Sequence, residues 1–168
     1  MKESDPFIAS PNFDDRPPGS KVELVVIHNI SLPPGEFGGP YIEDLFMNRL
    51  HPGAHPYFAG ISMLRVSAHY LIRRDGEVRQ FVDTEKRAWH AGVSSWKGRE
   101  RVNDFSIGIE LEGADDTPFE DAQYEALNRL LTELNRRYGK LPLTGHADIA
   151  PGRKTDPGPM FDWSRVNG

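Results

Sequence analysis

Histidine and carboxylate side chains carry most of the chemistry that this sequence can offer, because the chain has six histidines and no cysteine. His28 follows an apolar run at positions 22–27, and His146 follows a shorter apolar stretch. Asp156 lies ten residues after His146, in a segment rich in Pro and Gly. Two imidazoles and one carboxylate can fill three corners of a zinc tetrahedron and leave the fourth for water, as in catalytic zinc sites. The spacing alone does not distinguish such a site from unrelated polar residues at strand ends.

The other four histidines carry weaker signals. His51 and His55 are four residues apart, but Pro and Gly residues around them interrupt any helix, so we expect both in loops. His69 lies inside an expected strand, where a structural role and a role beside the substrate are equally open. His90 lies in the segment RAWHAG between two elements, where its pattern permits a binding role.

Five stretches have strand patterns that would position these side chains. Residues 22–27 are almost all apolar, which is typical of a strand covered on both faces. Residues 66–73 and 77–82 flank the dipeptide Asp-Gly, which predicts a hairpin. Residues 106–112 alternate, so that Glu110 and Glu112 share the face opposite three apolar side chains. A short strand at 141–144 contains Pro142, which favours an edge position.

One long helix and one short helix are expected. Thr117 and Glu120 form a capping-box pattern, Pro118 would take the first helical position, and Gly139 would follow the last turn. A second helix is expected over residues 41–50. The long helix carries one apolar stripe, made of Leu127, Leu130, Leu131, Leu134 and Tyr138. Strands with helices packed over them define an α/β domain with a mixed central sheet.

Composition excludes several classes of protein. A length of 168 residues fits one domain, which we expect at 21–168 after an N-terminal arm at 1–20. A net charge of -5 argues against a nucleic-acid binder. No window approaches the roughly 20 apolar residues of a membrane helix, and the acidic N-terminus does not match a secretory signal. The absence of cysteine excludes a thiolate nucleophile and a disulfide scaffold. We therefore expect a cytoplasmic monomer without membrane or nucleic-acid partners.

Several segments together resemble a known enzyme family. They are VVIHNIS, SAHYLIRRDGEVRQFV, RAWHAG, NDFSIGIELEG and, most specific of all, GHADIAPGRKTDPGP. In this order they are similar to the type 2 zinc-dependent N-acetylmuramoyl-L-alanine amidases, which share a fold with peptidoglycan recognition proteins. The resemblance spans about Lys21 to Trp163 and is strongest to the cytosolic branch that cleaves 1,6-anhydro-muropeptides in cell-wall recycling.

The resemblance implies specific roles for residues of this chain. It implies one Zn²⁺ per chain on the two histidines and the aspartate singled out above, His28, His146 and Asp156. It also implies that Glu110 and Lys154 are catalytic: Glu110 as general base, and Lys154 as a stabiliser of the tetrahedral oxyanion. The substrate contacts that it implies are Asn29, Arg65 and Trp89. Glu112 and Arg153 we interpret as solvated charges.

Three other functions remain to be weighed against a recycling amidase. An amidase acting on intact peptidoglycan would need export, for which we find no signal. A non-catalytic peptidoglycan-binding module of this fold typically lacks a zinc ligand, whereas all three candidate ligands are present. A structural zinc site would leave Glu110 and Lys154 without a role. Within the amidase interpretation, residues 29–60 are a candidate mobile flap, because long loops of this kind are often functional.

Overall fold

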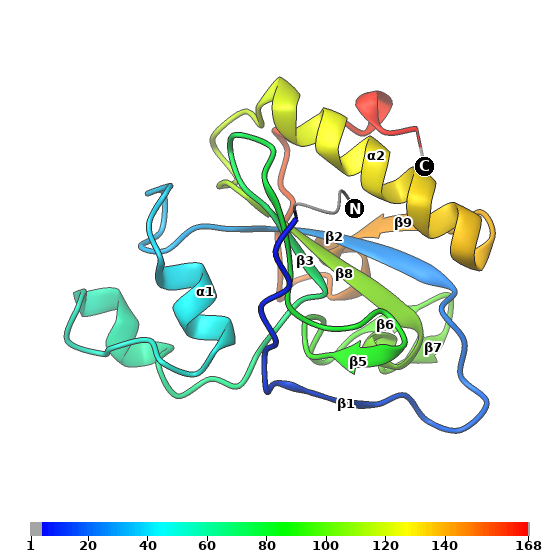
Figure 1. The fold of residues 1–168 in the computed structure, drawn as a ribbon, viewed down its shortest axis with the longest axis horizontal. Helices are drawn as coiled ribbons and strands as arrows, with labels where there is room; N and C mark the ends of the chain where they lie inside the picture. Colours follow the sequence, from blue (N-terminus) through cyan, green and yellow to red (C-terminus); the bar gives the residue numbers. More distant parts are fainter. Residues whose placement is uncertain (1–4, 168) are drawn as a thin grey trace.

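The computed structural model describes residues 5–167, which form a layered α/β domain around a five-stranded mixed sheet (Figure 1). The strand order is β4-β3-β8-β2-β9. The bounds are β2 (Leu24–Ile30), β3 (Tyr70–Ile72), β4 (Val78–Gln80), β8 (Ser106–Glu112) and β9 (Leu143–Gly145). Strands β3, β8, β2 and β9 are parallel, while β3 and β4 form the predicted antiparallel hairpin. The expected α/β class is confirmed. Strand β9 begins one residue after Pro142 and lies at the edge of the sheet, the position that Pro142 favoured.

Helix α2 (Asp121–Tyr138) covers one face of the sheet (Figure 1). Its apolar stripe packs on the odd-numbered side chains of β2 and β8, which form one buried core. The predicted start is wrong: Glu120 is the N-cap and exchanges hydrogen bonds with Gln123, while Thr117 lies in the preceding turn. The Gln123 side chain accepts a hydrogen bond from the Glu120 N–H at 3.0 Å, so the cap forms three residues later than predicted. Gly139 ends the helix as predicted, with φ 81°.

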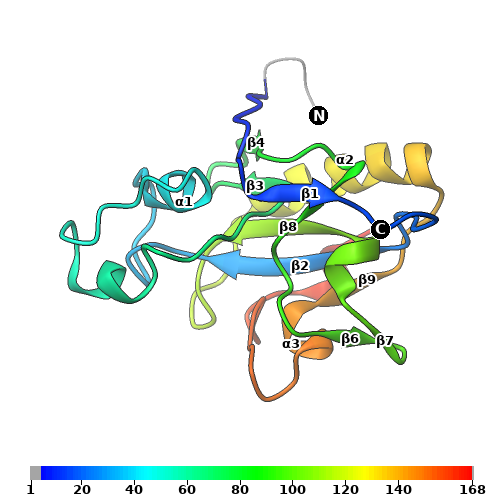
Figure 2. The same cartoon turned by 90° about the horizontal axis from the view of Figure 1, so that it is seen from below.

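The opposite face of the sheet packs against shorter elements. They are β6 (Ser95–Trp96), β7 (Arg99–Glu100), η2 (Val102–Phe105) and α3 (His146–Ile149), and Figure 2 shows β6, β7 and α3 below the sheet. Leu24 and Val26 of β2 contribute to a second core on this side, and His28 follows them on the same face. The functional side chains of β2 and β8 therefore point away from α2.

Glu112 is not the solvated acid that its pattern suggested. Its side chain is buried and accepts hydrogen bonds from the guanidinium of Arg73 at 2.9 Å and from the backbone N–H groups of Gly38 and Arg74. All seven residues of β8 are buried, because segments from both sides cover the strand.

A separate lobe is built from the segment between β2 and β3. It contains α1 (Tyr41–Phe46) and η1 (Pro56–Gly60), which pack on a third core together with β5 (Lys86–Ala88). Helix α1 is shorter than the predicted 41–50, because the chain leaves the helical conformation and Asn48 adopts φ 60°. At the C-terminus, η3 (Trp163–Arg165) completes the fold.

The N-terminal residues run along the edge of the domain. Strand β1 (Phe13–Asp15) pairs antiparallel with β5. The Arg16 guanidinium then donates four hydrogen bonds to main-chain carbonyls, those of Thr84, Asn103, Asp104 and Ser106. Within residues 5–167, none of the helices is both long and apolar enough to cross a membrane.

Candidate active site

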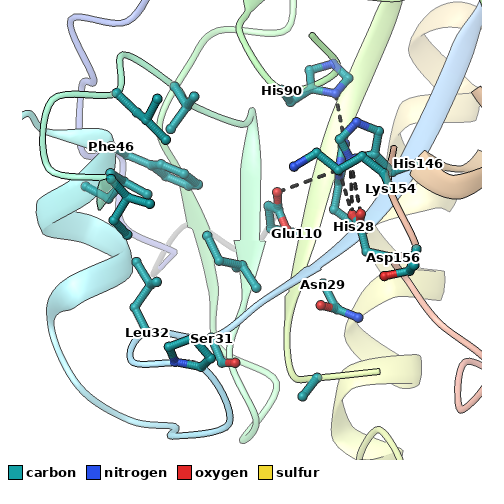
Figure 3. A pocket seen from close by; sticks show the side chains of 18 of the residues that line it. His28, Asn29, Ser31, Leu32, Phe46, His90, Glu110, His146, Lys154 and Asp156 are labelled. Carbon is teal, nitrogen blue, oxygen red and sulfur yellow. Dashed lines mark hydrogen bonds and ion pairs between the residues drawn. The ribbon is translucent and has the colours of Figure 1, made fainter. Parts of the chain in front are cut away.

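Three potential metal ligands converge on the face of the sheet opposite α2 (Figure 3). His28 comes from β2, His146 is the first residue of α3, and Asp156 lies in the loop that follows α3. The two Nδ1 atoms are 2.9 Å apart, and an Asp156 carboxylate oxygen lies 3.1 Å from that of His28 and 3.3 Å from that of His146. Within the described residues, this is the group of histidines and acids that could hold a metal ion.

The contacts behind the two rings determine where their protons lie. Nε2 of His146 lies 2.9 Å from the carbonyl oxygen of Ala91, which can only accept a hydrogen bond. A neutral His146 therefore carries its proton on Nε2 and presents a lone pair at Nδ1. Nε2 of His28 faces Nδ1 of His90 at 2.9 Å, and Nε2 of His90 faces the Ser106 hydroxyl at 3.1 Å. A chain of donors running from His28 through His90 to Ser106 leaves Nδ1 of His28 unprotonated as well.

The electrostatics of the cluster fit a cation. Burial lowers the pKa of His28, which favours the neutral ring that a metal requires. Two nitrogen lone pairs and a carboxylate that face one another without intervening protons repel each other unless a cation lies between them. This donor set matches the residue types that bind catalytic zinc.

Glu110 lies beside the cluster because β2 and β8 pair in register. The Cα atoms of His28 and Glu110 are opposite one another, and Oε1 of Glu110 is 3.7 Å from Nδ1 of His28. The other carboxylate oxygen, Oε2, is buried and has no hydrogen-bond partner. Burial, and next the neighbouring Asp156, raise the pKa of Glu110 well above its usual value, while Lys154 opposes the shift. A buried carboxyl with a raised pKa and a free oxygen is suited to moving a proton.

Lys154 and the cavity complete the site. The exposed Lys154 lies on the loop that carries Asp156, and its ammonium end is on the Glu110 side of the cluster (Figure 3). The cluster opens into a cavity of about 630 Å³. Its far wall is apolar and comes from the lobe between β2 and β3, with contributions from Leu32, Leu45, Phe46, Tyr57, Ile61, Leu64 and Val66. The arrangement can hold a small amphipathic molecule against the cluster of His28, His146 and Asp156.

Two of the three predicted substrate contacts line this cavity. Asn29 donates its amide hydrogens to Asp115 at 2.7 Å and to the Pro157 carbonyl at 3.0 Å, so its side-chain oxygen is left as an acceptor. Trp89 also lines the cavity, and its indole N–H is bound by Asp14. Arg65 is exposed, does not line the cavity and donates to the carbonyls of Met63 and Leu64. Its contact with substrate stays a prediction.

The remaining histidines are placed by the structure as well. His51 and His55 lie in loop segments, as predicted, with His55 capping η1. His69 is fully buried, accepts a hydrogen bond from the Gly108 N–H and contacts the Lys86 carbonyl, so its contacts are structural. Burial lowers the pKa of His69 to about 3.

The sequence did not reveal the contacts of three residues that support the site. His90 holds the back of His28, and the RAWHAG segment singled it out without indicating a partner. Arg153 is not simply solvated, because it donates to the same Ala91 carbonyl that contacts His146. Asp115 joins Asn29 to the hydroxyl of Thr155. All three make contacts far apart in the sequence, and only His90 left any signal in the local pattern.

Hydrolysis of an amide needs an activated water and a proton carrier. The cluster of His28, His146 and Asp156 beside Glu110, at one end of the central strands, is suited to supply both. The class of protein is therefore a hydrolase. The chain belongs to the N-acetylmuramoyl-L-alanine amidase family, whose model matches residues 18–159.

Known proteins similar to the chain agree with this assignment. The chain is 61% identical over 160 residues to the 1,6-anhydro-N-acetylmuramyl-L-alanine amidase AmpD of Citrobacter freundii, covering 94% of this chain and 86% of that one. A crystal structure of an AmpD selenomethionine derivative superposes with a TM-score of 0.96 at 59% identity, covering 98% of this chain and 93% of that one. The Escherichia coli amidase AmiD, solved with anhydro-N-acetylmuramic acid-L-Ala-D-gamma-Glu-L-Lys, matches with a TM-score of 0.63 at 31% identity, covering 98% and 58%.

Proposed function

We propose that this protein uses one Zn²⁺ per chain to hydrolyse the amide bond between the lactyl group of 1,6-anhydro-N-acetylmuramic acid and L-alanine, in the recycling of cell-wall muropeptides. The observation that carries the metal-dependent mechanism is the convergence of His28, His146 and Asp156 beside the unpartnered carboxylate oxygen of Glu110. The similarity to AmpD over most of the chain supports the substrate. The products are a free lactyl sugar and a peptide that begins with L-alanine.

The metal is held by His28, His146 and Asp156. When bound there, zinc supplies Lewis acidity, which lowers the pKa of a coordinated water toward 7 and polarises the scissile carbonyl. Ala91 and His90 fix the two rings from behind, so the ligand atoms are already in place before the metal arrives. Arg153 holds the Ala91 carbonyl from the other side at 2.7 Å.

Glu110 acts as the proton carrier. It takes a proton from the attacking water and returns a proton to the alanine nitrogen as the C–N bond breaks. Its burial supports both roles, because a pKa raised toward the working pH makes the carboxylate a stronger base and lets the acid form transfer its proton. No serine or cysteine nucleophile takes part in this mechanism.

Lys154 and the cavity residues bind and orient the substrate. The Lys154 ammonium stabilises the tetrahedral oxyanion. Asn29 offers an acceptor oxygen, which suits a peptide N–H of the substrate, because Asp115 and Pro157 occupy its amide hydrogens. Trp89 provides an aromatic face for the sugar, and the guanidinium of Arg65 suits a peptide carboxylate of the substrate.

The test is mass spectrometry of the purified protein incubated with an anhydromuramyl tripeptide, with and without a chelator. We expect release of the L-alanyl peptide, loss of release with chelator, and recovery when zinc is added. Peptide release that persists after the bound metal has been removed would refute the metal-dependent mechanism. Cleavage of intact peptidoglycan at an equal rate would refute the recycling substrate.

A cytoplasmic location and a monomeric state complete the proposal. A chain without cysteine has no disulfide to lose in a reducing compartment. Cell fractionation and light scattering test these two points, which a membrane-bound pool or a stable dimer would contradict.

A further inference from the structure

The cavity wall opposite the metal cluster is held in place by a segment that lies outside residues 18–159, which the family model matches. We call residues 8–16 the N-terminal strap. Its first part runs alongside the end of β4, where the N–H groups of Ile8 and Ser10 donate to the carbonyls of Gln80 and Phe81. Its last part is β1, paired with β5. In Figures 1 and 2 the dark-blue strap passes between α1 and the region of β3 and β4 before it reaches β1.

Asn12 is the centre of this attachment and is only 2% exposed. One of its two side-chain N–H groups donates to the carbonyl of Val66 at 2.8 Å, and the carbonyl of Phe46, at 3.2 Å, shares a hydrogen with a closer acceptor. It also exchanges a reciprocal pair of hydrogen bonds with the side chain of Asn48, at 2.8 and 2.9 Å. The carbonyl of Asn12 accepts from the Ser67 hydroxyl at 2.6 Å. One side chain thus joins the end of α1 to the segment that leads into β3.

These bonds satisfy backbone carbonyls that have no partner within a helix or a sheet. Phe46 is the last residue of α1, and the final carbonyls of a helix lack intrahelical donors. Ser10, itself buried, donates its hydroxyl to the same Phe46 carbonyl at 2.6 Å. Val66 lies in a stretch without secondary structure. The strap therefore fixes two main-chain segments that the sheet does not hold.

Both segments face the metal cluster across the cavity. Phe46, Val66 and Ser67 line the cavity, and Figure 3 shows Phe46 on the side opposite His28 and Glu110. The attachment extends to Trp89, whose backbone N–H donates to the Ser67 hydroxyl and whose indole N–H donates to Asp14 of the strap. No hydrogen bond that the structure gives Asn12 involves the metal cluster.

We propose that Asn12 is a positioning residue for the substrate, which fixes the cavity wall at Phe46, Val66 and Ser67 opposite the metal cluster. This inference rests on the proposed function, because it takes the muropeptide as the ligand of the cavity. Asn12 acts on binding alone: without its bonds the wall loosens and KM rises, whereas the metal site and the chemical step are unaffected.

The test compares two perturbing variants with a matched control. Asn12→Asp keeps the shape but places a carboxylate oxygen against the acceptors at Val66, Phe46 and Asn48. Asn48→Gly removes the reciprocal amide at an exposed position, and glycine accepts its φ of 60°. The control, Asp15→Asn, changes an exposed strap residue that pairs with Lys86 on the surface.

Steady-state hydrolysis of the anhydromuramyl tripeptide by zinc-loaded enzyme is measured together with zinc affinity and amide hydrogen exchange. We expect KM to rise about tenfold for both perturbing variants, the effect of losing one buried hydrogen bond. Zinc affinity and kcat should match the wild type, and exchange should be faster at residues 45–48 and 66–67 but unchanged at 107–111. The control should behave as wild type.

Wild-type KM and exchange in both perturbing variants would overturn the inference. Loss of zinc, or a fall of kcat without a rise of KM, would overturn it too, because either would indicate a structural role only. If the wild-type enzyme fails to release peptide, the proposed function fails, whereas the exchange measurement still tests whether the strap fixes the wall.

Discussion

Replacing Glu110 by Gln should remove activity while leaving the fold intact or more stable. The substitution keeps the size of the side chain but abolishes its capacity to accept and return a proton. Loss of one general acid–base group costs about 10²- to 10⁴-fold in rate, which corresponds to about 3 to 5 kcal/mol of transition-state stabilisation.

The effect on stability has the opposite sign. Glu110 is 8% exposed and has one buried oxygen without a partner. An unsatisfied buried polar atom costs about 1–3 kcal/mol, and more when it is charged. In metal-free protein no cation offsets this cost, so Glu110→Gln should unfold at a temperature equal to or above that of the wild type. Calorimetry after chelation checks this point, and kcat of the zinc-loaded variant checks the catalytic one.

Glu112→Gln is the matched control, because Glu112 is the next acid on the same face of β8. Its carboxylate is paired with buried Arg73 at 2.9 Å. Breaking that pair should destabilise the protein by about 3 kcal/mol, the lower end for a buried pair because Gln keeps one acceptor oxygen, and kcat should be retained. A Glu110→Gln enzyme within tenfold of the wild-type rate would refute the proton-transfer role. A clear loss of its stability would refute the argument from burial.

Four further predictions test other parts of the molecule. His146→Ala should lose zinc and activity together, and full zinc retention in elemental analysis would remove this residue from the ligand set. Lys154→Met should lower kcat by about 10²- to 10³-fold with zinc still bound; an unchanged kcat would end its oxyanion role. Because burial lowers the pKa of His69 to about 3, the unfolded state takes up a proton first as the pH falls below about 6.5, and stability declines from there toward pH 3. Urea titrations at several pH values give the slope of the unfolding free energy against pH. His69→Asn should lower this slope by up to about 1.4 kcal/mol per pH unit, and an unchanged slope would contradict the prediction. Residues 29–60 should resist proteolysis better with product bound, and equal cleavage rates would speak against a flap.

The sequence predicts the framework well where a pattern is local. The alternation at 106–112 gives the bounds and the faces of β8, and the apolar run at 22–27 indicates the inner strand β2. The same alternation treats Glu110 and Glu112 alike, although one oxygen of Glu110 has no partner and Glu112 is bound by Arg73. The difference depends on a residue 39 positions away, which no periodicity can indicate.

The candidate site is likewise predicted only in part from the sequence. Strand-end reasoning selects His28, His146 and Asp156, and the family resemblance adds Glu110 and Lys154. The residues that support them were not predicted. The bond from His28 to His90 spans 62 positions, and that from Asn29 to Asp115 spans 86. Such pairs form only when the sheet brings distant segments together, so the structure is needed to find them.

The pairing of His28 with Glu110 across β2 and β8 has a consequence for how this enzyme can diversify. A slip of one residue between the strands would turn every side chain of one strand to the other face, so insertions here would abolish the reaction and destroy the core together. The wall opposite is built from the lobe between β2 and β3, whose loops can change length without disturbing that ladder. Substrate specificity for the sugar and the peptide can therefore change during evolution while the reaction stays the same.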